Sequence, residues 1–246
     1  MQITSFENQK TGVRIQPGFA WDEQDAYLFD IDGTLLRDTS RIHYKSFAFS
    51  IQQVMGLEVS LDGVSIHGST DTAILRDACR QAKIPAELLA LRREAILKAM
   101  RLKVAEQRHD LRLRLMPGVE DALRHLERKG ALLGVATGNL EEIGWIKIEE
   151  AGLRHWFRFG GFSDHCPVRA ELVGNAARMA REMAGDAARI CVVGDTPRDI
   201  AAAHANNLPV IAIATGNFSF DDLLELQPEV CASSLAGLLA HTRVTP

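Results

Sequence analysis

This sequence lacks both long apolar runs and cysteine motifs. No apolar run approaches the roughly 18 residues of a membrane span, so no membrane partner is expected. The first residues, MQITSFENQK, show no basic-then-apolar signal pattern. Cys79, Cys166, Cys191 and Cys231 lie too far apart to form a metal or redox motif. We therefore expect buried free thiols and a cytoplasmic location.

An excess of either charge is also missing. Lys and Arg number 28 against 32 Asp and Glu, a net charge of −4, and aromatic residues make up 6% of the chain. A general nucleic-acid-binding protein is more basic, so no nucleic-acid partner is expected. The segment 92–114 is locally basic, with eight Lys or Arg against three Asp or Glu. We interpret it as a solvated helix face; the alternative is a positive field that attracts anionic substrates.

Strand-like and helix-like segments alternate over much of the chain. The apolar segments with strand character are 26–31, 131–136, 190–194 and 209–214. The segments with helical patterns between and after them are 117–130, 140–151, 169–184 and 197–206. Apolar strands that alternate with helices indicate a parallel sheet with both faces covered. The length, 246 residues, fits one domain with an insertion or two modest domains.

The segment between the first strand and residue 115 has a different character. Helical patterns cover residues 41–55, 68–82 and 85–106, and no convincing strand is present. The sequence therefore predicts an α/β fold, a Rossmann-like core with an inserted α-helical cap. We expect the core to comprise residues 1–37 and 116–246, with 1–26 as a short arm that forms a hairpin or a tail. The cap is then residues 38–115.

Polar residues follow the predicted strands. Asp30 and Asp32 follow the first strand, Thr137 follows the second, and Asp195 and Asp199 follow the third. Ligands of open parallel sheets bind beyond the carboxyl ends of the strands, so these residues are expected to gather at one edge. A cluster of like charges needs a cation. Hard oxygen ligands suit Mg²⁺, which also shares a substrate phosphate.

These residue types suit phosphoryl transfer. A carboxylate can attack phosphorus and form an aspartyl-phosphate. A second carboxylate can protonate the leaving oxygen and later deprotonate water. Thr137 and the backbone amides of Gly138 and Asn139 can hold phosphoryl oxygens. One fixed cationic side chain is still needed to balance the charge of the transferring group.

The strings DIDGTLL (30–36), VATGN (135–139) and VVGDTPRD (192–199) occur in this order. In this respect the chain resembles the haloacid dehalogenase superfamily, in its phosphatase branch. The resemblance implies that Asp30 is the nucleophile and that Asp32 is the general acid and base, with its backbone carbonyl on the metal. It further implies that Thr137 binds the phosphoryl group, that Asp195 binds Mg²⁺, and that Asp199 supports the metal directly or through water. The second carboxylate, Asp32, argues against dehalogenation, because the dehalogenase branch lacks it.

The third motif of the superfamily departs from the usual pattern here. That motif normally supplies Lys, and the plausible basic residue in this chain is Arg169, at the start of the helix RAELVGNAARMA. Its fork of donors suits phosphate, although a surface Arg in a first helical turn is the alternative. The string ATGN occurs again at 214–217. We interpret the second copy as a turn, and the alternative is a loop near the site.

The segment after the first motif resembles the family's small helical cap, which excludes water and selects the substrate. Asp38, Thr39 and His43 resemble the stretch that leads into the cap in sugar-phosphate relatives, and His67 and Gly68 resemble a cap loop that faces the site. Both histidines could instead be ordinary surface or core residues. The residues expected to contact substrate are Gly33, Gly138, Asn139, His43, His67 and Gly68, and Gly33 also permits a sharp turn.

We therefore expect a Mg²⁺-dependent phosphomonoesterase that hydrolyses a small phosphorylated metabolite, such as phosphoglycolate or a sugar phosphate. The metal site would comprise Asp30, Asp32, Asp195 and Asp199. A phosphotransferase or mutase with the same residues is one alternative. A phosphonate hydrolase would need a Lys that forms a Schiff base, and no clear candidate is evident. A non-catalytic binding module on the same scaffold is a further alternative. The protein is expected to be a monomer or a homodimer.

Overall fold

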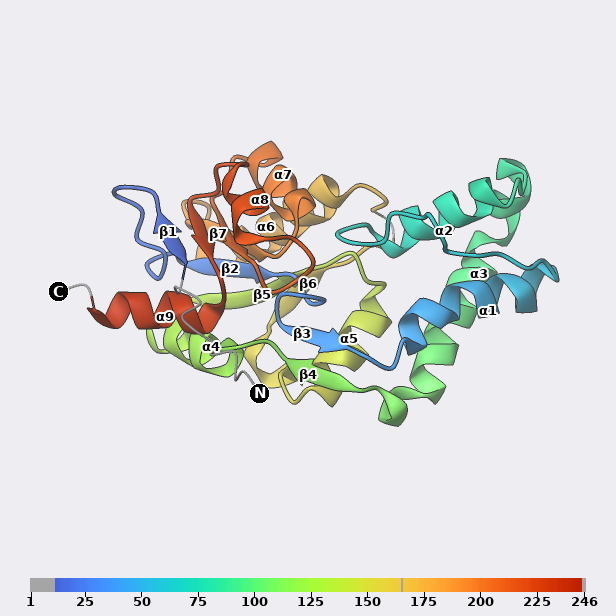
Figure 1. Ribbon diagram of the computed structural model, residues 1–246, viewed down its shortest axis with the longest axis horizontal. Coiled ribbons are helices and arrows are strands. Elements are labelled where there is room, and N and C mark those ends of the chain that lie inside the picture. Colours follow the sequence, from blue (N-terminus) through green and yellow to red (C-terminus); the bar gives the residue numbers. More distant parts are fainter. Residues whose placement is uncertain (1–11, 165, 245–246) are drawn as a thin grey trace, which may run out of the picture.

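A seven-stranded sheet forms the centre of the computed structural model, which describes residues 12–164 and 166–244 (Figure 1). Its strands lie in the order β1 (Val13–Ile15), β9 (Val230–Ala232), β8 (Val210–Ile213), β7 (Ile190–Gly194), β2 (Ala26–Phe29), β5 (Leu132–Ala136) and β6 (Phe159–Gly161). All neighbours from β9 to β6 are parallel, and β1 pairs antiparallel with β9. The predicted α/β class and parallel sheet are confirmed.

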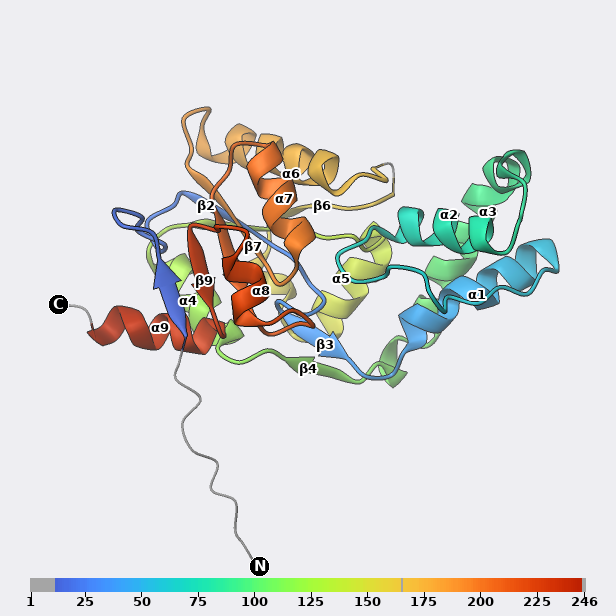
Figure 2. The ribbon, with the colours of Figure 1, turned by 45° about the horizontal axis from the view of Figure 1, so that its top comes forward.

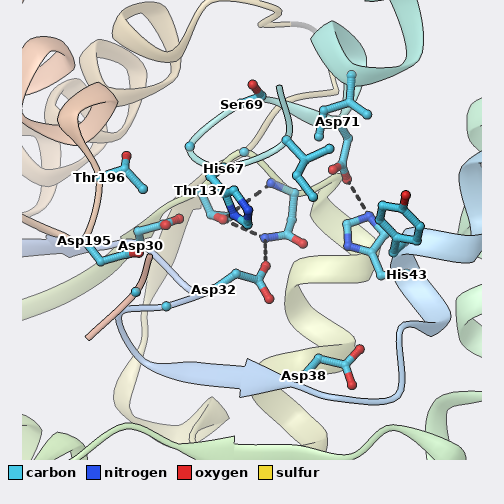
Figure 3. Close-up of a pocket in the computed structure, with 18 of the residues that line it drawn as sticks. Asp30, Asp32, Asp38, His43, His67, Ser69, Asp71, Thr137, Asp195 and Thr196 are labelled. Carbon is cyan, nitrogen blue, oxygen red and sulfur yellow. Dashed lines mark hydrogen bonds and ion pairs between the residues drawn. The ribbon is translucent and has the colours of Figure 1, made fainter. Parts of the chain in front are cut away.

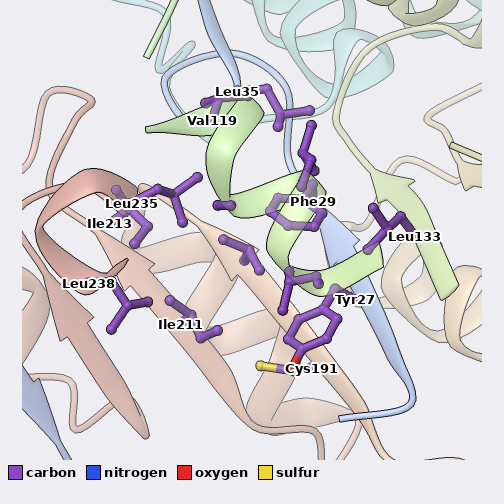
Figure 4. Close-up of a cluster of buried hydrophobic side chains, with 14 of the residues drawn as sticks. Tyr27, Phe29, Leu35, Val119, Leu133, Cys191, Ile211, Ile213, Leu235 and Leu238 are labelled. Carbon is purple, nitrogen blue, oxygen red and sulfur yellow. The ribbon is translucent and has the colours of Figure 1, made fainter. Parts of the chain in front are cut away.

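Both faces of this sheet are buried, which explains the continuous apolar strands. Tyr27 and Phe29 of β2 pack into one apolar cluster, whereas Ala26 and Leu28 pack into another on the opposite face. Figure 4 shows the first cluster. The first face is covered by α4 (Val119–Arg128) and α9 (Leu235–Val244), and the second by α6 (Arg169–Ala184), α7 (Pro197–Ala205) and α8 (Phe220–Leu224).

The strand register brings the polar segments to one edge. Phe29 of β2 lies opposite Val135 of β5 and Val193 of β7. These three strands therefore end at nearly the same level of the sheet. The residues directly after them are Asp30, Thr137 and Asp195. The central position of β2 places its two aspartates between the other two polar segments.

A helical cap lies beyond this edge (Figures 1 and 2). Its helices are α1 (Ile42–Met55), α2 (Asp71–Gln81) and α3 (Ala86–Glu106), followed by the short 3-10 helix η1 (Arg108–Asp110). The two chain segments that connect cap and core form a small antiparallel sheet of β3 (Leu36–Asp38) and β4 (Leu113–Leu115). The expectation of no strand between Asp38 and Leu115 was therefore wrong. Strands of three residues are too short to show a period, and pairing between distant segments creates them.

Helix α5 (Glu141–Glu150), which precedes the 3-10 helix η2 (Arg154–Trp156), belongs to the chain of the core but packs against both parts. Ile143 and Ile146 join the apolar cluster of the cap, which contains Ile96 and Met100 of α3. Ile148 joins the cluster beneath the sheet. The cap thus completes its own apolar core with a helix that follows β5.

Ion pairs add to this contact between cap and core. Arg101 of α3 lies 2.7 Å from Asp164, and Arg108 lies 3.0 Å from Glu149 and 2.6 Å from Glu150. The basic segment 92–114 was expected to be a solvated face. Part of it instead contacts acidic groups of the core, because the sequence cannot show which side of α3 faces α5.

The expectations about the N-terminal arm and the cysteines are met only in part. Residues 1–11 of the expected arm lie outside the described residues, and β1 extends the main sheet rather than forming a hairpin. All four cysteines are free, but Cys166 is only partly buried. Among the described residues, no helix combines the length and apolarity needed to cross a membrane.

Asp22 links the segment before β2 to α4. Its carboxylate lies 2.7 Å from the His125 Nε2 and 2.8 Å from the Lys129 Nζ. Burial raises the pKa of Asp22, but the hydrogen bonds from Lys129 and His125 outweigh it and hold the pKa below its usual value. The ionised carboxylate therefore stabilises the fold above its unfolded pKa, and this contribution is lost as the pH falls through the folded pKa.

We predict that Asp22→Asn lowers the free energy of unfolding at pH 7 by about 1–2 kcal/mol. The difference from the wild type shrinks as the pH falls toward 3, because the unfolded carboxyl group then binds a proton that the folded one resists. Urea unfolding between pH 7 and pH 3 measures this, with the exposed Asp186→Asn as the control. A difference that stays constant over this pH range would contradict the assignment.

Candidate active site

A pocket of about 450 Å³ lies between the carboxyl edge of the sheet and the cap (Figure 3). Most of the expected site residues line it: Asp30, Asp32, Gly33, His43, His67, Gly68, Thr137, Gly138, Asn139, Arg169 and Asp195. Asp199 is buried behind this lining, against Arg169. The structure therefore gathers residues from three strand ends and from the cap around one space.

Buried carboxylates form the floor of the pocket and lie directly behind it. Asp30, Asp195 and Asp199 each place a carboxylate oxygen within 4.8 Å of the others. Burial, opposed by Arg169 and reinforced by Asp199 and Asp32, raises the pKa of Asp30 to about 6. Burial and the neighbouring Asp30 and Asp199 raise the pKa of Asp195 to about 8. The cluster therefore resists full ionisation without a cation, as expected for like charges in a desolvated site.

The donor set of this cluster fits a hard divalent cation. Carboxylate oxygens in a buried pocket are the ligands that such ions prefer. Two glycines make room for the Asp195 carboxylate, since a Cβ on either Gly33 or Gly216 would collide with its oxygens. Gly33 also has a φ of +94°, which favours glycine. The backbone on both sides of Asp195 is therefore shaped around this carboxylate.

Arg169 supplies a buried positive charge beside the carboxylates. Its Nη2 lies 2.9 Å from Asp30 Oδ1 and 2.6 Å from Asp199 Oδ1, and its Nη1 donates to the carbonyl oxygen of Gly68 at 3.1 Å. Burial opposes its charge, but Asp199 and Asp30 more than compensate and raise the pKa of Arg169. Nη2 has no well-aligned hydrogen-bond acceptor among the described residues. Its charge therefore faces the carboxylates of Asp30 and Asp199 at the edge of the pocket.

Asp199 has a structural role in addition to its place in the cluster. Its Oδ2 accepts from the Thr196 backbone N–H at 3.0 Å and from the Thr196 hydroxyl at 2.7 Å, a capping box at the start of α7. Its Oδ1 accepts from Arg169 Nε at 2.9 Å. Both carboxylate oxygens are thus engaged by protein donors. The Asp199 side chain therefore both caps α7 and orients Arg169.

Asp32 also lines the pocket, and its side chain is 43% exposed. Asn139 Nδ2 donates to Asp32 Oδ2 at 2.8 Å and to the hydroxyl oxygen of the buried Thr137 at 2.8 Å (Figure 3). Partial desolvation raises the pKa of Asp32, but the charge and hydrogen bonds of Lys147 outweigh it, so the net shift is downward. Asn139 therefore connects the second carboxylate with the threonine of the second motif.

Lys147 was missed in the sequence analysis. This α5 side chain is 2% exposed, and its Nζ lies 2.6 Å and 2.8 Å from the two carboxylate oxygens of Asp32. It also donates to Asn139 Oδ1 at 2.8 Å and contacts His43 Nδ1 at 3.1 Å. One signal was available: a lone Lys between Ile146 and Ile148 in an otherwise apolar part of the helix. A lysine flanked by buried residues rarely occurs without a partner.

The cap contributes His43 and Asp71 to the same network. His43 Nε2 lies 3.0 Å from Asp71 Oδ2, which also accepts from the Leu140 backbone N–H at 2.8 Å. An ammonium group can only donate, so His43 Nδ1 accepts from Lys147 and Nε2 carries the proton that reaches Asp71. His43 also stacks on Phe47 with ring centroids 5.5 Å apart. His43 is therefore a fixed pocket residue, not a surface histidine.

The second ATGN string corrects another expectation. Residues 214–217 do form a turn after β8, but Gly216 and Asn217 line the pocket. The Thr215 hydroxyl donates to the Gly33 carbonyl oxygen at 2.6 Å, and the Asn217 amide lies 2.8 Å from a ring nitrogen of His67. β8 lies beside β7 in the sheet, so the turn that follows it reaches the same edge.

The cap loop packs directly on the core at the second motif. The Asp71 backbone N–H donates to the Gly138 carbonyl oxygen at 2.7 Å, and the Thr70 hydroxyl donates to the Pro167 carbonyl oxygen at 2.8 Å. A Cβ at Gly138 would collide with the carbonyl oxygen of Ser69. Gly138 is therefore required for the close approach of the cap, in addition to any contact with substrate.

Comparisons with known proteins agree with this geometry. The family model for haloacid dehalogenase-like hydrolases matches residues 27–213. A phosphoglycolate phosphatase of Xanthomonas campestris is 30% identical over 83% of this chain and 90% of its own. One from Mesorhizobium japonicum is 32% identical, but the match spans only about half of each chain. The crystal structure of "a predicted phosphoglycolate phosphatase" from Haemophilus somnus aligns with a TM-score of 0.63 and 20% identity over 89% of this chain and 98% of that one.

The chain thus belongs to the haloacid dehalogenase-like hydrolase family, and its relatives place it in the phosphatase branch. The family model spans β2 to β8, which includes the strand ends that build the pocket and the inserted cap. The sequence resemblance to this family is confirmed.

We predict that Gly216→Ala weakens the binding of a divalent cation by about tenfold, because the new methyl group would displace the Asp195 carboxylate. Isothermal titration with Mg²⁺ measures the effect. Gly237→Ala in α9 is the control, since its added Cβ would meet only the side-chain hydroxyls of Ser233 and Ser234, at 3.2 and 3.5 Å. Unchanged Mg²⁺ affinity in a folded Gly216→Ala protein would show that Asp195 does not bind the metal.

Proposed function

We propose that this protein is a Mg²⁺-dependent phosphomonoesterase that acts on a small phosphorylated metabolite through an aspartyl-phosphate. The observation that carries this proposal is the buried Asp30 carboxylate, which lies 2.9 Å from the buried guanidinium of Arg169. A nucleophile so placed can attack a phosphoryl group whose oxygens face the same guanidinium. Phosphoglycolate is the first substrate to test, because the curated relatives carry the name phosphoglycolate phosphatase.

The first step transfers the phosphoryl group to the enzyme. A carboxylate oxygen of Asp30 attacks phosphorus, and the bond between phosphorus and the ester oxygen breaks. Asp32 must hold a proton for this step, against the downward shift in its pKa that Lys147 causes, and it gives that proton to the departing oxygen, which leaves as an alcohol. Asp32 is suited to this step because its half-exposed carboxylate lies on the side of Asp30 that faces His43 of the cap (Figure 3).

The second step releases inorganic phosphate. Ionised Asp32 takes a proton from water as the water oxygen attacks phosphorus, and the bond to Asp30 breaks. Asp30 returns as a carboxylate and Asp32 as the acid. Through both steps, Thr137, the amides of Gly138 and Asn139, and Arg169 hold the phosphoryl oxygens. Each of these residues lines the pocket.

The Mg²⁺ ion would be held by Asp30, Asp195 and the backbone carbonyl of Asp32. It would supply positive charge against the phosphate. We assign Asp199 an indirect role, because its two oxygens are engaged by Arg169 and Thr196. It holds the guanidinium in place and anchors the start of α7, behind the metal ligands.

The pocket favours small substrates. Its volume of about 450 Å³ is shared between the phosphate-binding edge and a partly apolar wall from the cap, formed by Phe47, Ile66 and Ile74. The cap loop bonds to the core at Gly138 and Pro167, so a bulky ester would have to disrupt these contacts. The cap thereby restricts access, as a lid does when it excludes water.

We predict that Asp30→Asn lowers kcat for p-nitrophenyl phosphate and for phosphoglycolate by about a thousandfold or more, because the amide cannot act as the nucleophile. Phosphate release is measured with Mg²⁺ and with EDTA, and wild-type turnover requires Mg²⁺. Asp221→Asn, at an exposed position of α8, is the control.

Mg²⁺-dependent turnover that survives in Asp30→Asn would rule out this nucleophile. Phosphate that appears on an added sugar rather than in solution would indicate the phosphotransferase alternative. Metal binding by the wild type without turnover of either substrate, and without trapping of beryllofluoride, would indicate a non-catalytic module.

A further inference from the structure

Lys147 is a buried charged residue with no part in the chemical steps above. Its 2% exposure means that the ammonium group has lost almost all contact with water. A buried ammonium is costly unless each of its protons finds an acceptor. The acceptors here are Asp32, Asn139 Oδ1 and His43 Nδ1, at distances between 2.6 and 3.1 Å. The three protons of the ammonium group are therefore all used.

This environment distinguishes between two roles for a pocket lysine. A lysine that forms a Schiff base needs a free lone pair on its nitrogen. An ammonium that donates to three acceptors, one of them a carboxylate, has none. The phosphonate hydrolase alternative needed a candidate lysine, and Lys147 has the right location but the wrong hydrogen bonds. Its geometry suits holding another residue in place.

The residue that it holds is Asp32. The two side chains differ sharply in exposure, 2% for Lys147 and 43% for Asp32. A half-exposed carboxylate on a turn after a strand has several rotamers open to it. The buried ammonium contacts both of its oxygens, and Asn139 Nδ2 contacts one of them. The buried cation is thus the fixed member of the pair, and it determines where the carboxylate points.

The third acceptor of Lys147 comes from the cap. His43 lies in α1, and its ring is fixed by Asp71 of α2 and by stacking on Phe47. Lys147 lies in α5, whose Ile143 and Ile146 pack into the apolar cluster of the cap. If the cap were displaced, the ammonium would lose an acceptor and gain access to water. The contact between cap and core and the orientation of Asp32 therefore depend on the same lysine.

We propose that Lys147 is a positioning residue that aims the Asp32 carboxylate at the leaving oxygen, and that His43 of the cap completes its set of acceptors. This inference rests on the proposed function, in which Asp32 is the general acid. Lys147 does not touch the reacting atoms. It acts on the reaction through the orientation of Asp32, and His43 makes that orientation a property of the docked cap.

The test compares two leaving groups. An alkyl phosphate such as phosphoglycolate needs a proton on its leaving oxygen, whereas p-nitrophenolate leaves readily without one. General acid catalysis contributes about 10²–10⁴-fold to a rate. Lys147→Met is therefore expected to lower kcat/KM for phosphoglycolate about 10- to 100-fold more than for p-nitrophenyl phosphate. Asp32→Asn gives the reference pattern, and Lys98→Met, at an exposed position of α3, is the control.

A second pair of variants tests the cap. His43→Asn retains an acceptor near the position of Nδ1 and is expected to show a smaller difference between the two substrates than His43→Leu. His43→Leu removes the acceptor and is expected to show the same leaving-group pattern as Lys147→Met. His43 lines the pocket and is less deeply buried than Lys147, so its substitution is less disruptive to folding. These variants therefore test the inference even if Lys147→Met fails to fold. Thermal unfolding verifies the fold of each variant.

Equal losses on both substrates for folded Lys147→Met and His43→Leu would overturn the inference, since a general structural defect affects both alike. Reduction with borohydride in the presence of phosphonoacetaldehyde provides a further check. A covalent adduct on Lys147 would overturn the positioning role. The parent proposal fails separately, if wild-type turnover does not depend on Asp30.

Discussion

Buried like charges at the carboxyl edge of the sheet are the constraint around which this molecule is arranged. Asp30, Asp195 and Asp199 lie within a few ångströms of one another without access to bulk water. Arg169 offsets part of this charge, but burial and the repulsion between the carboxylates still raise the pKa values of Asp30 and Asp195. In the proposed function, a divalent cation would balance the remaining negative charge.

Lys147 is a second buried cation in the site, and it contacts the remaining carboxylate, Asp32. Arg169 contacts Asp30 and Asp199 and donates to the Gly68 carbonyl oxygen of the cap. Lys147 contacts Asp32 and His43 of the cap. Each cation therefore contacts both a core carboxylate and a cap acceptor. The electrostatic balance of the core and the docking of the cap are in this way coupled, because desolvated cations need complete sets of acceptors.

Local patterns in the sequence were sufficient for the sheet and for the residues that follow its strands. Apolar runs such as AYLF and ICVVG can only be buried, and Asp30, Thr137 and Asp195 follow them at once. Contacts between distant segments were not predictable in this way. The β3–β4 pair, the approach of the 214–217 turn and the partners of Lys147 all depend on packing that no short window of sequence contains. Arg169 was found from a motif, but its contact with Gly68 was not.

Helix α5 has a consequence for how such a protein can change over time. Its Ile143 and Ile146 complete the apolar interior of the cap, and its Ile148 completes that of the core. The cap therefore shares α5 with the core. Grafting it onto a related core, or replacing it with a foreign one, would leave half of α5 facing an unmatched surface. Exchange of the cap would therefore require matching changes on the apolar side of α5.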